Sequence, residues 1–218
     1  MTRSLIAKPF GTWPSTITPE LITTAAPGLS SVQSHNENVF WVESRAWEAG
    51  RSVILCQDKH GHIREMFPAP FSHNSKVHEY GGSAYTVADN HLYFVNANDQ
   101  CIYRVALDQE TEPEAISQQG PWRFADIIFD GAHRRLIMVC EEHRQQGEPE
   151  NYLASLVIDG SDQVPTRLVD GADFYAYPRL SADQKTLCWI QWNHPQMPWD
   201  ATQLWIANNQ QLALTEHR

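Results

Sequence analysis

Short apolar strands separated by polar turns recur along the whole chain. Four of them start on a polar residue and continue with apolar ones, at residues 38–43, 91–96, 135–140 and 186–191. A second strand follows each after a loop, at residues 52–55, 101–105, 151–157 and 203–206, and the starts of these strands lie roughly 50 residues apart. Because the strands are rich in Val, Ile, Tyr, Phe and Trp and are bounded by Asp, Asn, Gly and Pro, they favour antiparallel hairpins.

Two further strands complete each repeat. One precedes the pair, at residues 29–33, 82–87, 124–129 and 176–180, and a short one closes it, at residues 63–67, 114–117, 166–169 and 211–215. Four-stranded repeats of about 40 to 50 residues are typical of propeller blades, which bury their faces against neighbouring blades. We therefore predict an all-β fold, a β-propeller with about four blades in an incomplete ring. Residues 1–26 lead into blades at 27–75, 76–120, 121–171 and 172–218.

The charge and the apolar content of the chain exclude several classes of protein. The formal net charge is −10 and the chain has no basic run, so we expect no nucleic-acid partner. It has neither a signal-peptide core nor a long apolar run, so we expect a cytoplasmic protein without a membrane segment. The cysteines are scattered, which favours buried free thiols in a reducing compartment over a disulfide or zinc site.

Several stretches resemble known propellers. Residues 177–190 are similar to the turn pattern of TolB-like propellers, although Gln184 stands where that pattern usually has Gly. Others resemble the N-terminal propeller region of the prolyl oligopeptidase family of serine peptidases, in its acylaminoacyl-peptidase and dipeptidyl-aminopeptidase-like branch. The most specific are His-Glu-Tyr-Gly-Gly at 78–82 and His-Pro-Gln-Met-Pro-Trp-Asp at 194–200. The resemblance extends over nearly the whole chain.

This resemblance implies two partners, an α/β-hydrolase domain and a peptide substrate. In the family the hydrolase domain supplies the catalytic triad, and the propeller screens the peptides that reach it. The chain itself contains no Gly-x-Ser-x-Gly nucleophile motif. The nearest stretch, Gly-Gly-Ser-Ala-Tyr at 81–85, lacks the last glycine and leads into a strand, so we interpret Ser83 as structural. We expect a chain truncated before the hydrolase domain, with no catalytic residue and no peptidase activity of its own.

Candidate binding residues fall in the long loops expected on one face of the propeller. Glu141 and Glu142 are candidates to bind the free amine of a peptide, since paired carboxylates give an ammonium more than one charge-assisted hydrogen bond. The alternative is an acidic pair neutralised by a nearby arginine such as Arg144. Candidate interface residues are His78, Glu79, Tyr80, Gly81 and Gly82, together with His194, Met197 and Trp199. Their alternative roles are a tight connection between blades and a cover for the blade below.

The sequence leaves two other functions open. The chain is a candidate for a free-standing propeller that binds a protein partner or acts as a scaffold. A propeller hydrolase with an axial calcium ion is a weaker candidate, because we find no set of inward acidic ligands from several blades. His73 and His78 lie in one loop without a metal-ligand spacing, so we expect no metal and no cofactor.

Overall fold

The regular structure of the chain is almost entirely β-strand. The computed structural model describes every residue except 1–6, 20, 22–26, 110, 160–162 and 212–218. Its elements are, in order, β1 (Gly28–His35), β2 (Asn38–Arg45), the 3-10 helix η1 (Ala46–Glu48), β3 (Arg51–Gln57), β4 (Ile63–Glu65), the 3-10 helix η2 (Val77–Glu79), β5 (Tyr85–Ala88), β6 (His91–Val95), β7 (Ile102–Ala106), β8 (Glu114–Ala115), β9 (Trp122–Asp130), β10 (Arg135–Glu142), β11 (Glu150–Val157), β12 (Thr166–Val169), β13 (Phe174–Leu180), β14 (Thr186–Trp192) and β15 (Gln203–Asn208).

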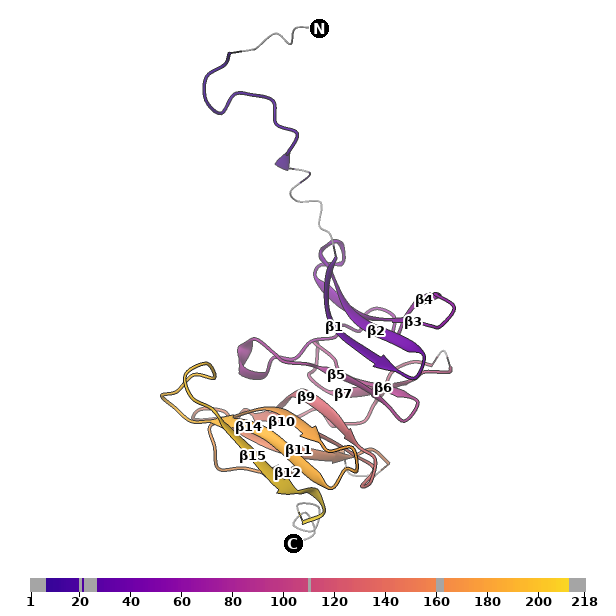
Figure 1. Ribbon diagram of the computed structural model, residues 1–218, viewed down its shortest axis with the longest axis vertical. Helices are drawn as coiled ribbons and strands as arrows, with labels where there is room; N and C mark the ends of the chain where they lie inside the picture. The colour runs from indigo at the N-terminus through magenta and orange to yellow at the C-terminus, as the bar shows by residue number, and fades with distance from the viewer. Residues whose placement is uncertain (1–6, 20, 22–26, 110, 160–162, 212–218) are drawn as a thin grey trace.

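The strands form four antiparallel sheets, each built from strands that are consecutive in the chain. We name them blade 1 (β1–β4), blade 2 (β5–β8), blade 3 (β9–β12) and blade 4 (β13–β15). The innermost strands contact one another in chain order, β1 with β5, β5 with β9 and β9 with β13. The blades therefore follow one another around an axis (Figure 1), and the predicted β-propeller is confirmed.

Three apolar cores hold the blades together, one between each successive pair. Phe40, Ile54 and Phe94 belong to the core between blades 1 and 2, Tyr93 and Leu136 to the next, and Ile137 and Leu187 to the core between blades 3 and 4. Blade 3 is covered on both faces, which explains why nearly every residue of β10 is buried. Burial of these apolar faces is the main force that favours the blade stack.

Blades 1 and 4 each have one face that the described residues leave uncovered. Strand β1 is largely exposed along its length, and in β15 Leu204 and Ile206 remain 68% and 66% exposed. Among the described residues, no strand of blade 1 makes an extensive contact with a strand of blade 4. Residues 7–19 extend away from the blades (Figure 1), and the side chain of Phe10 is 96% exposed there.

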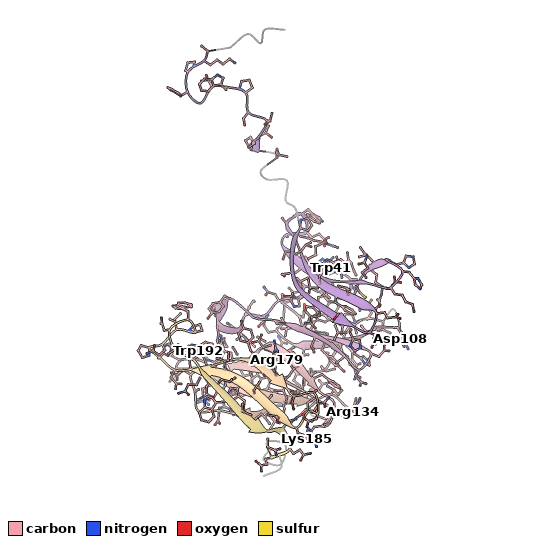
Figure 2. All side chains as sticks on the ribbon, viewed as in Figure 1. Trp41, Asp108, Arg134, Arg179, Lys185 and Trp192 are labelled. Atoms are coloured by element: carbon pink, nitrogen blue, oxygen red, sulfur yellow. The ribbon has the colours of Figure 1, made fainter. Side chains whose placement is uncertain are left out.

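The connections between strands lie at two opposite ends of the blades. Figure 2 shows Trp192 at one end of β14 and Lys185 just before its other end. The β2–β3, β10–β11 and β14–β15 loops and the β4–β5 connection emerge at the Trp192 end, which we call the loop face. The hairpin turns β3–β4 and β13–β14 lie at the opposite end.

Candidate functional site

The β4–β5 connection, which carries the predicted His-Glu-Tyr-Gly-Gly stretch, crosses the loop face and packs on blade 3. Its helix η2 contacts β9 and β10, and Val77 is only 1% exposed within the core between blades 3 and 4. His78 and Glu79 adopt positive φ angles of 53° and 65°. The connection joins blade 1 to blade 2, but its helix η2 packs on blade 3.

The two glycines of this stretch allow a close approach to neighbouring backbone and side chains. Gly81 has a φ of 80°, and a Cβ atom there would lie 2.8 Å from the carbonyl oxygen of Ser75. A Cβ atom on Gly82 would lie 3.1 Å from Cβ of Ala125 and 3.3 Å from Oδ1 of Asp126. The first contact forbids a larger residue unless the backbone moves.

Glu141 fixes the connection to the end of β10. Its carboxylate is buried and accepts hydrogen bonds from the backbone N–H of His78 at 2.7 Å and from Nη1 of Arg123 at 3.4 Å. The Nε2 atom of His143 lies 2.6 Å from the same carboxylate. Arg123 also pairs with Glu79 at 2.7 Å, and the hydrogen bond from this guanidinium lowers the pKa of Glu79.

Glu142 belongs to a separate ionic network on the outer part of blade 3. Nη2 of Arg167 lies 2.8 Å from Glu142 and 2.6 Å from Glu150, and its guanidinium carbon lies 4.1 Å from the centre of the Tyr152 ring. Arg144 bonds to Glu150. The two glutamates are therefore paired with arginines of the chain, as the alternative interpretation predicted, but with Arg123 and Arg167 in place of Arg144. The β10–β11 register places Glu150 opposite Glu142, and β12 brings Arg167 beside both.

An aromatic cluster stands beside the connection and joins it to blade 4. The ring centres of His78 and Phe174 are 5.2 Å apart, those of Phe174 and Trp192 are 5.3 Å apart, and those of Phe174 and His194 are 4.9 Å apart. His78 Nε2 lies 3.2 Å from Oδ1 of Asn151. Burial lowers the pKa of His78 despite the opposing effect of the nearby Glu141 carboxylate and the Asn151 contact.

Of the predicted site residues, His78, Glu141 and His194 lie close together, whereas Met197 and Trp199 lie apart from them. His78 and Glu141 are in direct contact, and His194 joins them through Phe174. Met197 and Trp199 lie farther out on the β14–β15 loop and are 40% and 75% exposed. Ser83 donates its backbone N–H to Asp126 at 3.1 Å.

Asp126 is a site residue that the sequence analysis missed. It occupies a bulge in β9 with a φ of 53° and is 7% exposed. Its two carboxylate oxygens accept hydrogen bonds from the backbone N–H groups of Ser83 at 3.1 Å and Tyr177 at 2.9 Å. One side chain of β9 in blade 3 thus links the β4–β5 connection to the inner strand β13 of blade 4. A single acidic residue inside the apolar run 124–129 was the signal that could have indicated it.

Two cavities lie on either side of Asp126. The first, of about 240 Å³, lies on the loop face between the β4–β5 connection and the inner strands of blades 3 and 4. The second, of about 450 Å³, lies between the inner strands of blades 1 to 3 and Arg179. Figure 2 shows Arg179 among the inner strands. Asp126 and Ser83 line both cavities.

The described residues contain no group of three or more His, Cys, Asp or Glu side chains placed to hold a metal ion. No helix of the described part of the chain is long and apolar enough to cross a membrane.

Solved structures of peptidases are similar to this chain over most of its length. No protein-family model matches it, and no curated protein does. A puromycin-hydrolyzing peptidase of Mycobacterium tuberculosis is 30% identical over 92% of this chain, with a TM-score of 0.84. A puromycin hydrolase is 26% identical over 94% of it, with a TM-score of 0.83. These neighbours are peptidases of the prolyl oligopeptidase family, and the chain matches the part of them that fits the N-terminal propeller region.

This propeller region spans about a third of the solved structures that it matches, 33% of the mycobacterial peptidase and 34% of the puromycin hydrolase. TolB from Acinetobacter baumannii is 15% identical with a TM-score of 0.52, which shows a shared fold alone. The resemblance to the propeller region of these peptidases, predicted from the loop-face motifs, is thus confirmed.

Proposed function

We propose that this chain is the propeller portion of a cytosolic serine peptidase of the prolyl oligopeptidase family, and that it screens the peptides that reach a hydrolase domain. The observation that supports this most is the 30% identity over 92% of the chain to a puromycin-hydrolyzing peptidase. Cys56, Cys101 and Cys140 are buried free thiols, which fits a reducing compartment.

The loop face is the surface that we assign to the hydrolase domain and to the substrate. It carries exposed aromatic side chains, with Tyr80 and Trp199 each 75% exposed, around the stacked rings of the partly buried Phe174 and the buried Trp192. Such loops on a rigid scaffold are where binding residues concentrate. Aromatic side chains of this kind are enriched in the centres of protein interfaces.

We propose that Glu141 and Glu142 bind a peptide amine, which would have to compete with arginines of the chain for these carboxylates. Each carboxylate already contacts an arginine of the chain, Arg123 for Glu141 and Arg167 for Glu142. A peptide ammonium would have to displace or share these partners. We expect Glu142 to exchange more readily, because Glu141 is buried whereas Glu142 is partly exposed.

A chimeric enzyme tests the screening role. In it, this chain replaces the matched third of the mycobacterial puromycin-hydrolyzing peptidase, and cleavage of a short aminoacyl substrate is compared with cleavage of a long unfolded peptide. Shortening the loop-face segment 193–201 to Gly-Gly should raise cleavage of the long peptide relative to the short one. The matched control shortens the β3–β4 turn at 58–62, at the opposite end of the blades, and should change neither rate. An unchanged ratio in the loop-face variant would refute screening by this face.

A further inference from the structure

The cavity on the loop face has the form of a receptor for one side chain. Its volume of about 240 Å³ is smaller than the roughly 300–1,000 Å³ of pockets for drug-sized ligands. Apolar side chains in its lining are Val77, Ala125, Val139 and Ile190, which come from the β4–β5 connection and from blades 3 and 4. Three separate parts of the chain thus line one mainly apolar space.

The chemistry of the lining favours a ligand with a positive charge next to an apolar body. Asp126 is the one acidic residue of the lining, which contains no Lys or Arg, and burial lowers the pKa of His78, which also lines the cavity. Its two hydrogen bonds from backbone N–H groups leave further lone pairs on the carboxylate. The rings of Tyr177 and Trp192 add aromatic faces, which attract organic cations.

We propose that this cavity binds an apolar or aromatic side chain with an adjacent ammonium group, as found at the first residue of a peptide with a free amino terminus. This inference rests on the proposed function, because it names the class of peptide that the propeller portion would select. It assigns the recognition to Asp126 and the cavity walls, which are distinct from the Glu141 and Glu142 carboxylates.

The inference is tested by comparing how tightly the unmodified chain binds two amides that differ in one charge. L-phenylalaninamide carries the ammonium group, and N-acetyl-L-phenylalaninamide has the same ring without the charge. Titration followed by protein NMR should show that the charged amide binds about 10-fold more tightly, the size expected for a partly desolvated cation–π and carboxylate contact. Equal affinities for the two amides, or no binding of phenylalaninamide, would overturn the proposal.

Variants locate the binding. Ile190→Trp fills the cavity and should weaken phenylalaninamide binding by at least about 10-fold. Leu204→Trp is the matched control, since Leu204 pairs with Ile190 across β14 and β15 but lies outside the cavity lining, and its affinity should not change. Tyr177→Ala removes one exposed ring at the cavity and should reduce the preference for the charged amide. Binding that survives Ile190→Trp would show that the amide binds elsewhere.

The amide titration and the chimera assay can fail independently of each other. The amide titration uses the chain alone and measures no peptidase activity, whereas the chimera measures cleavage. A chimera that screens peptides while the chain ignores both amides would overturn only the cavity assignment.

Discussion

A buried ion pair at the end of blade 3 connects this blade to blade 4. Nε of Arg135 lies 2.9 Å from Oδ2 of Asp130, and the two side chains are 1% and 0% exposed. Asn209, which follows β15, accepts from Arg135 Nη2 at 3.0 Å and donates to Asp130 at 2.8 Å. Because His133 contributes a further contact of 2.8 Å, Oδ2 of Asp130 has polar partners on both blades.

Removing the positive member of this pair should destabilise the chain strongly. Arg135→Met leaves the Asp130 carboxylate buried with too few partners, which costs about 3–5 kcal/mol in comparable sites. At the urea m-value expected for a chain of this size, the unfolding midpoint should fall by about 1–2 M. Tryptophan fluorescence during urea unfolding measures this midpoint, because Trp189 and Trp192 lie in blade 4.

The neighbouring arginine provides the control. Arg134 is half exposed and pairs with Asp89 and Asp159 at the surface, so Arg134→Met should leave the midpoint unchanged. The double variant Asp130→Asn with Arg135→Met should recover most of the loss, since it removes the unpaired charge. Equal midpoints for Arg134→Met and Arg135→Met would show that the buried pair contributes no more to stability than the surface pairs do.

The remaining predictions concern the β4–β5 connection. His73 is buried, and burial lowers its pKa from 6.5 to about 4, so the unfolded chain takes up a proton in this range before the folded chain does. Stability should therefore decrease as the pH falls from 6.5 toward 4, by on the order of 3 kcal/mol from this residue. His73→Phe should remove that part of the pH dependence in urea unfolding, and an identical pH profile would contradict it. Gly81→Ala should lower stability by more than Gly50→Ala, because both glycines have a φ of 80° but only Gly81 meets backbone within 4 Å. Similar losses for the two variants would contradict a steric role for Gly81.

The strand pattern was predictable because each blade repeats it. The predicted strand at 166–169 coincides with β12, and the predicted start of β10 at 135 is the observed one. Strand β5 begins at Tyr85, later than the predicted residue 82, because Gly82 and Ser83 still belong to the connection packed on Asp126. The predicted strand at 211–215 lies outside the described residues except Gln211, which is in a helical turn.

The site was only partly predictable, because its partners are far apart in the sequence. Glu141 and His78 were identified separately from local motifs, but their contact depends on how the connection crosses blade 3. Arg167 reaches Glu142 from a strand two positions farther in the blade, so sequence proximity suggested Arg144 instead. The bulge at Asp126 depends on register, which the alternation of apolar residues alone does not determine.

The assignment of this chain as the propeller portion of a peptidase is tested by hydrolysis of puromycin and of aminoacyl chromogenic amides. The purified chain is assayed beside the chimera in which it replaces the matched third of the mycobacterial peptidase. We expect no hydrolysis by the chain alone and hydrolysis by the chimera, because the chain contains no Gly-x-Ser-x-Gly nucleophile motif. Hydrolysis by the chain alone, or a folded chimera without activity, would contradict its assignment as the propeller portion of such a peptidase.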